Sequence, residues 1–169
     1  ATLWYWGWLL LCYRTLIVLS YAHMKAKIKG PRKIFGYHMV MDCYGCDRKI
    51  IDSIDVCYKY LNTMTEIMKV HKQSEPYVVY TDPIKYPDKA GISAWVPIVE
   101  SGVSIHTLTP TGFISVDVYS CKKFNADKVR EYTKNTFKAK EIEEKHFLRG
   151  EKYIHPTKNE VRESMKDWT

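Results

Sequence analysis

The chain has 169 residues, of which 46% are hydrophobic and 14% aromatic, and this composition excludes a disordered or low-complexity protein. The length is that of one domain. A net charge of +7 could suit nucleic acid, but Lys and Arg are spread along the chain and no DNA- or RNA-binding motif is present. We therefore expect a solvated basic surface and no nucleic-acid partner.

Residues 1–22 form a hydrophobic stretch in which only Arg14 is charged. The length is close to a membrane span, but a central Arg costs about 2.5–3.5 kcal/mol on insertion, and the basic start of a signal peptide is missing. Ala22-His23-Met24 resembles a cloning junction, and the sequence from Met24 resembles a natural start. We expect residues 1–23 to be a non-native or hydrophobic N-terminal extension. A membrane anchor is the open alternative if residues 1–22 are native.

Hydrophobic periodicity predicts the elements of the remaining chain. The apolar run at 35–42 indicates a buried strand, and helical spacing from Ile50 predicts one helix to about His71, with Asp47 as its cap. Pro97 indicates an edge or a bulge in the strand that contains it. Asn125 can cap the second helix. The further elements expected are strands at 77–80, 92–99, 103–108, 113–119 and 141–148, and a helix from 126 to about 137.

This order of elements predicts an α+β fold, a mainly antiparallel sheet with two helices on one face. We expect the domain to span residues 24–156, followed by a polar, frayed tail at 157–169.

The five cysteines show no disulfide framework, and their number is odd, which argues against a secreted scaffold and favours the cytoplasm. Cys43 and Cys46 form a CxxC motif without a second CxxC or a nearby His pair. We expect two reduced cysteines there and no metal site.

Ser101 has an unusual set of neighbours in the sequence. Glu100 precedes it, Ser93 lies eight positions before it, His106 five after it and Cys121 twenty after it, all on strand-like runs. Each residue alone has an ordinary explanation, because a lone His in a strand is usually a satisfied polar group and a lone buried Cys is usually packing. The joint spacing indicates a functional group.

That spacing resembles the pyruvoyl-dependent S-adenosylmethionine decarboxylases of bacteria and archaea. The segment 42–47 resembles the family's Leu-Tyr-Gly-Cys-Asp, and Phe147-Leu-Arg-Gly150 adds support, so the resemblance covers residues 34–155. It implies that the chain cuts itself between Glu100 and Ser101, giving a β chain of residues 24–100 and an α chain of residues 101–169. Ser101 would then become a covalently bound pyruvoyl cofactor.

The resemblance also implies a role for each residue of the group. His106 takes the α-proton of Ser101 during elimination, a task that suits an imidazole, and Ser93 helps to hold the ester intermediate. In turnover the substrate amine forms a Schiff base with the pyruvoyl carbonyl, which acts as the electron sink. Cys121 returns a proton to the α-carbon, and Tyr86 lies near the position of the family's adenine-stacking Phe.

Two departures bear on the substrate. Gly102 stands where the family has His, and Pro110 stands where the family has a Glu expected to bind the ribose hydroxyls. We predict decarboxylation of S-adenosylmethionine for spermidine synthesis. The alternatives are a pyruvoyl-dependent ornithine or arginine decarboxylase and an unprocessed, non-catalytic homologue.

The resemblance further implies a homodimer of αβ units. Helices cover only one face of the predicted sheet, so two sheets pairing face to face would form a sandwich and bury the other face.

Overall fold

The computed structural model describes residues 34–165 of the chain, so the predictions for residues 1–23 lie outside the described residues. One compact unit spans Ile34–Glu151. The second unit includes helix α5 (Lys158–Met165). This helix lies within the segment for which a polar, frayed tail was expected. No helix within 34–165 is long and apolar enough to cross a membrane.

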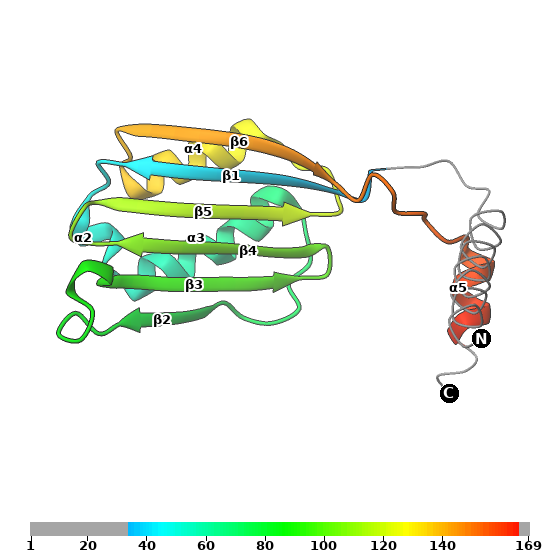
Figure 1. The fold of residues 1–169 in the computed structure, drawn as a ribbon, viewed down its shortest axis with the longest axis horizontal. Helices are drawn as coiled ribbons and strands as arrows, with labels where there is room; N and C mark the ends of the chain where they lie inside the picture. Colours follow the sequence, from blue (N-terminus) through cyan, green and yellow to red (C-terminus); the bar gives the residue numbers. More distant parts are fainter. Residues whose placement is uncertain (1–33, 166–169) are drawn as a thin grey trace, which may run out of the picture. The chain divides into compact units, whose positions relative to one another are not determined.

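A six-stranded sheet forms the body of the first unit, in the order β2-β3-β4-β5-β1-β6 (Figure 1). Every neighbouring pair of strands is antiparallel. The strands are β1 (Gly36–Tyr44), β2 (Tyr77–Thr81), β3 (Gly91–Ile98), β4 (Ser101–Leu108), β5 (Phe113–Ser120) and β6 (Glu141–Arg149). The predicted α+β class with an antiparallel sheet is confirmed, and each predicted strand is present within one to two residues.

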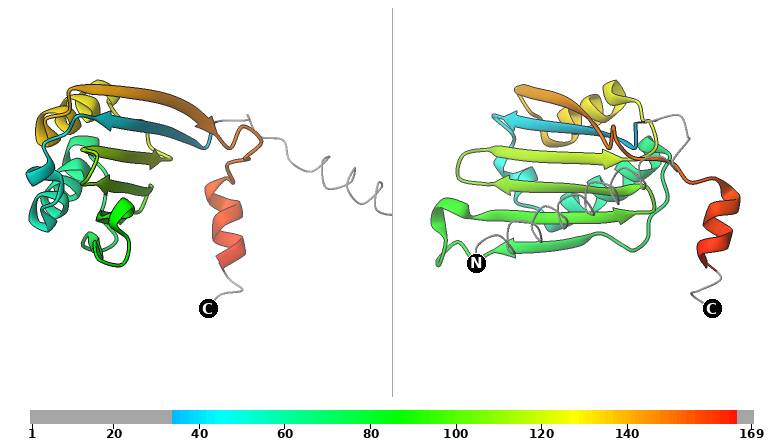
Figure 2. Two further views of the ribbon diagram at one scale, coloured as in Figure 1. Left: turned by 60° about the vertical axis from the view of Figure 1, so that its left-hand side comes forward. Right: turned by 45° about the vertical axis from the view of Figure 1, so that its right-hand side comes forward.

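All helices of this unit lie on one face of the sheet (Figures 1 and 2). They are α2 (Arg48–Ile51), α3 (Ile54–Met68) and α4 (Ala126–Phe137), and a short 3-10 turn, η1 (Pro87–Lys89), precedes β3. The Asp47 carboxylate caps α2 by accepting a hydrogen bond from the Lys49 N–H at 2.9 Å. Asn125 caps α4, as predicted.

The single helix predicted from Ile50 to His71 is wrong, because the chain breaks it in two. The Ser53 hydroxyl accepts from the Val56 N–H at 3.3 Å and so starts a new helix. That helix ends at Met68, because Lys69 takes a left-handed conformation with φ 56°. Three helices therefore cover the sheet where two were expected.

The two faces of the sheet differ in chemistry. Side chains alternate along each strand, and those facing α3 and α4 form the apolar core. The aromatic centre of this core is Tyr60, which is fully buried and packs 4.6 Å from Phe137, ring centre to ring centre. The opposite face carries polar and half-exposed side chains and no helix of the unit Ile34–Glu151. This open face holds Ser93 and His106.

Candidate active site

Ser93 and His106 face each other across the open side of β3 and β4. The register pairs the two residues directly, and the Ser93 Oγ lies 2.7 Å from the His106 Nδ1. They line a hollow of about 280 Å³ together with Tyr77, Trp95 and Ser104. The imidazole is therefore oriented by a hydroxyl partner, as a residue that transfers protons must be.

Ser101 lies at the other end of β4, where a two-residue turn joins it to β3. Ile98 pairs with Ser101, so Val99 and Glu100 form the turn. Tight hairpins of this length favour positive φ in the turn, which Val and Glu disfavour. The positive angle falls instead on Ser101, at φ 142°.

This backbone angle is exceptional within the described residues. The other non-glycine residues with positive φ are Lys69 and Lys138, which occupy ordinary left-handed positions at helix ends. A non-glycine residue at such an angle stores about 1–3 kcal/mol of strain. The strain lies in the residue that follows the Glu100–Ser101 bond.

The carbonyl of that bond is also polarised. Ser101 pairs with Ser120 across β4 and β5, and the next residue, Cys121, donates its backbone N–H to the Glu100 carbonyl oxygen at 2.8 Å. A hydrogen-bond donor on a carbonyl oxygen stabilises negative charge that develops there during nucleophilic attack. The Cys121 thiol itself is exposed.

The other described cysteines are unsuited to proton transfer. Burial raises the pKa of Cys43 to about 12, and burial likewise raises the pKa of Cys46 to about 11. Cys57 is buried in the same core. Within residues 34–165, no group of three or more His, Cys, Asp or Glu side chains could hold a metal ion.

A second hollow, of about 380 Å³, lies on the open face beside Ser101. Its walls include Trp95, Tyr119 and the pair formed by His38 and Asp117, whose Nε2 and Oδ1 atoms lie 3.2 Å apart. None of these four residues was predicted from the sequence as a site residue. The available signal was strand alternation, which places them on the face of Ser93 and His106.

Gly102 and Trp95 are sterically coupled in this hollow. A Cβ added at Gly102 would lie 2.6 Å from the Trp95 Nε1. The indole therefore occupies the space that a side chain at position 102 would need, and it would have to move to admit a larger residue.

Within one chain, the structure does not bring the predicted residues into one group. His106 lies five residues further along β4 than Ser101, a separation of about 17 Å at about 3.4 Å per residue. Cys121 is beside the Glu100–Ser101 bond, whereas Ser93 and His106 form a separate pair. Ser101 and His106 of one chain are therefore not neighbours in space.

Tyr86 and Pro110 lie toward the His106 end. Tyr86 is half exposed in the loop between β2 and β3, with the Lys85 ammonium 5.2 Å from the centre of its ring. Pro110 is exposed in the turn between β4 and β5. Neither residue is at the Ser101 end of the sheet.

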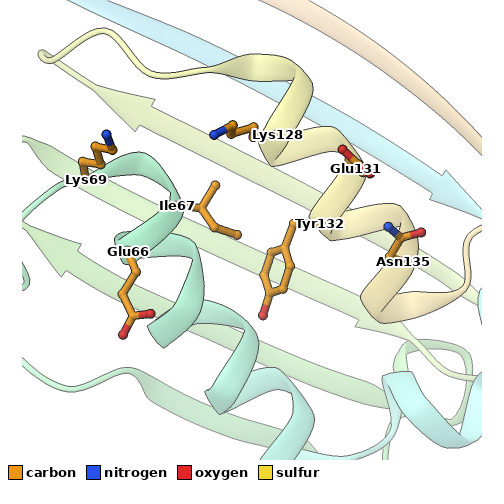
Figure 3. Close-up of a pocket in the computed structure, with 7 residues that line it drawn as sticks. All are labelled: Glu66, Ile67, Lys69, Lys128, Glu131, Tyr132 and Asn135. Carbon is orange, nitrogen blue, oxygen red and sulfur yellow. The ribbon is translucent and has the colours of Figure 1, made fainter.

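A larger groove, of about 490 Å³, lies between α3 and α4, away from all these residues (Figure 3). Its floor is Ile67 and Tyr132, with charged side chains of both signs at its edges. It contains none of the predicted catalytic groups.

Comparisons with known proteins identify the family of the chain. The family model for S-adenosylmethionine decarboxylase matches residues 37–150. The chain is 30% identical over 125 residues to an S-adenosylmethionine decarboxylase proenzyme of Sulfurihydrogenibium sp., covering 73% of this chain and 89% of the relative. It is 27% identical over 119 residues to the Clostridium botulinum proenzyme, covering 70% of this chain and 97% of the relative. The crystal structure of the Aquifex aeolicus adenosylmethionine decarboxylase superposes with a TM-score of 0.60 at 25% identity, covering 75% of this chain and 98% of that one.

An α+β domain with a strained Glu-Ser bond and a separate Ser–His pair defines a candidate self-processing enzyme. The chain belongs to the S-adenosylmethionine decarboxylase family. The resemblance seen in the sequence is confirmed, and with it the expected class of enzyme, a carboxy-lyase.

Proposed function

We propose that this chain is a proenzyme that cuts itself between Glu100 and Ser101, and that the mature enzyme decarboxylates S-adenosylmethionine for spermidine synthesis. The proposal rests on the backbone geometry and the hydrogen bonding at the Glu100–Ser101 bond. Ser101 has φ 142°, and the Glu100 carbonyl oxygen accepts a hydrogen bond from Cys121. The attacking hydroxyl, the strain and the polarised carbonyl meet at one peptide bond.

The first step is an acyl shift. The Ser101 Oγ bonds to the Glu100 carbonyl carbon, the C–N bond breaks, and the hydroxyl proton passes to the nitrogen. The Cys121 N–H, at 2.8 Å from the carbonyl oxygen, stabilises the charge that forms there. The product is an ester, and strain at Ser101 is released when the peptide bond is cut.

Elimination then separates the two chains. A base removes the α-proton of Ser101, the Cβ–O bond breaks, and Glu100 leaves as the carboxylate end of the β chain. The resulting dehydroalanine takes up one water and releases ammonia, which leaves a pyruvoyl group. When present, this group supplies an electron sink for decarboxylation.

We infer that the base is His106 of a second copy of the chain. Within one chain His106 is about 17 Å from Ser101, too far for proton transfer. The open faces of two sheets, packed in opposite directions, would bring the His106 end of one copy to the Ser101 end of the other. Tyr86 and Pro110 lie at the same end as His106 and would accompany it. A homodimer sandwich would therefore place a base beside Ser101, which His106 of the same chain cannot reach.

Cys121 is the proposed acid of the turnover reaction. Its thiol is exposed beside the Ser101 end, and a thiol can donate a proton at neutral pH. The proposed location is the cytoplasm, where such a thiol stays reduced. The family match favours S-adenosylmethionine over ornithine or arginine as the substrate.

Intact mass after expression tests self-cleavage. We expect two fragments, with a pyruvoyl-blocked α chain that begins at position 101, and release of carbon dioxide from S-adenosylmethionine. Ser101→Ala should give a single uncut chain. A wild-type chain that stays full length through long incubation would contradict the proposal and favour the non-catalytic alternative.

Complementation tests the shared site. Ser101→Ala and His106→Ala chains are each expected to be inactive alone. Random pairing of the two should restore about a quarter of wild-type activity, because half of the dimers are mixed and each has one intact site. A monomer by light scattering, or a mixture without activity, would reject the shared site and leave the test of self-cleavage unaffected.

A further inference from the structure

His71 contacts both residues of the turn that precedes Ser101. Its carbonyl oxygen accepts from the Val99 N–H at 2.8 Å. Its own N–H donates to the Glu100 Oε2 at 3.1 Å, and its Nδ1 lies 3.0 Å from the Glu100 Oε1. One residue outside the catalytic group thus binds the backbone and the carboxylate of the turn.

These contacts belong to a closed ring of interactions around the Glu100–Ser101 bond. On the other side of Glu100, its carbonyl oxygen accepts from the Cys121 N–H at 2.8 Å. The next residue, Lys122, donates from its Nζ to the carbonyl oxygen of Lys69, two residues before His71. The end of α3 and the end of β5 are therefore tied to each other as well as to Glu100.

The ring opposes relaxation of the strained residue. To reach an ordinary φ, Ser101 must rotate the peptide plane that joins it to Glu100. That rotation carries the Glu100 carbonyl away from Cys121 and pulls its side chain against the bonds from His71. A strained backbone conformation persists only where surrounding interactions hold it in place. Here His71 supplies two of the hydrogen bonds that hold Glu100.

We propose that His71 is a positioning residue for self-cleavage, which holds Glu100 so that its carbonyl stays on the Cys121 N–H and Ser101 stays strained. This role rests on the proposed self-cleavage and adds a residue to it. All His71 contacts are with the β-chain side of the bond, so they remain after the cut and keep the new carboxylate end in place.

The contacts with His71 also affect the ionisation of Glu100. Partial burial acts to raise the pKa of Glu100, but the hydrogen bonds from His71 outweigh it and hold the pKa below its usual value. A surface pair without a positioning role serves as the comparison. His146 and Glu144 form such a pair on β6, with Nε2 and Oε1 3.3 Å apart.

The test follows the cleavage rate on denaturing gels during cell-free synthesis of the full chain. His71→Ala removes the imidazole bond, and we expect cleavage to slow by roughly fivefold. His71→Asn should recover most of the rate, because its side-chain amide N–H can replace Nδ1. His146→Ala, the matched control, should cleave at the wild-type rate.

Titration of the Glu100 carboxyl by NMR provides a second measurement, made in the uncleavable Ser101→Ala chain. Adding His71→Ala should raise the pKa of Glu100 toward its usual value, whereas His146→Ala should not. This measurement uses folded, uncut protein and does not depend on catalysis.

The outcomes separate this role from the proposed function. If wild type and His71→Ala cleave equally fast, the role of His71 is rejected and self-cleavage stands. If wild type never cleaves, the proposed function fails and the role fails with it. An unchanged Glu100 pKa in the His71→Ala chain overturns the imidazole contact with Glu100, whatever the cleavage result.

Discussion

The two ends of strand β4 hold the proposed catalytic groups in different backbone conformations. At one end Ser101 is strained, and the carbonyl before it is fixed by a backbone donor. At the other end His106 lies on an ordinary strand with a short hydrogen bond to Ser93. The proposed cleavage site and the proposed base therefore lie about 17 Å apart in one chain.

Because of this difference, substitutions at the two ends should impair different steps of the proposed reaction. Changes at the Ser101 end should affect the acyl shift, and changes at the His106 end should affect elimination and substrate binding. Under the proposed function, such a division would require two copies of the chain to meet before maturation is complete.

His106→Ala should give the largest effect among changes away from Ser101. The acyl shift should proceed, but elimination should slow by about 10²–10⁴-fold, the usual contribution of a general base. The ester should therefore accumulate, and hydroxylamine should cut it into two fragments on a denaturing gel. Ser101→Ala provides the contrast, because it forms no ester and should resist hydroxylamine. Normal maturation of His106→Ala would show that the two ends are not divided in this way.

Cys121→Ala should separate maturation from turnover. Alanine keeps the backbone N–H that binds the Glu100 carbonyl, so cleavage should stay at the wild-type rate. Loss of the thiol should lower carbon dioxide release by about 100-fold. Cys121→Ser is the matched variant, since it keeps the size and changes the acidity. Wild-type turnover with no loss of pyruvoyl in Cys121→Ala would refute the role.

Gly102→His tests the coupling between Gly102 and Trp95. The new side chain needs the space of the indole, whose Nε1 would lie 2.6 Å from the added Cβ. Such overpacking typically costs about 1–3 kcal/mol, and we expect decarboxylation to fall by about tenfold. Adding Trp95→Val should restore it to within about twofold. If the double variant is no better than Gly102→His alone, Trp95 is not the reason for glycine at this position.

Local sequence signals predicted the fold well, because they act over short distances. Strand alternation and the cap at Asn125 located their elements to within a few residues. The helix expected from Ile50 to His71 was misplaced because its apolar spacing continues through Ser53, whose hydroxyl starts a new helix. Periodicity does not detect such a break.

The candidate site was harder to predict, because its geometry depends on strand register. The spacing of Ser93, Ser101 and His106 indicated the right family, but residues on adjacent antiparallel strands, such as Ser93 and His106, can be neighbours or far apart for the same spacing in sequence. The observed strand pairing decides the question. Ser93 pairs with His106, whereas Ser101 pairs with Ile98 at the other end of the same two strands. His71 was missed for the same reason, since its contacts with Glu100 join segments 29 residues apart.

Pro110→Glu should have the smallest effect, and it tests the substrate side of the His106 end. The resemblance places a ribose-binding Glu at this position, and the turn around Pro110 is already fixed. The Thr109 hydroxyl donates to the Asp52 Oδ1 at 2.9 Å, and the Thr109 N–H donates to the Ala90 carbonyl at 2.9 Å. Proline donates no backbone hydrogen bond, so replacing it removes none. A new carboxylate there should lower the KM for S-adenosylmethionine by about threefold to tenfold, the value of one hydrogen bond to a charged group at a partly exposed site. Thr111→Glu is the control, because it adds the same charge to an exposed position of the same turn. Equal changes in KM for the two variants would indicate a general charge effect, and no change in either would show that this turn does not reach the nucleoside.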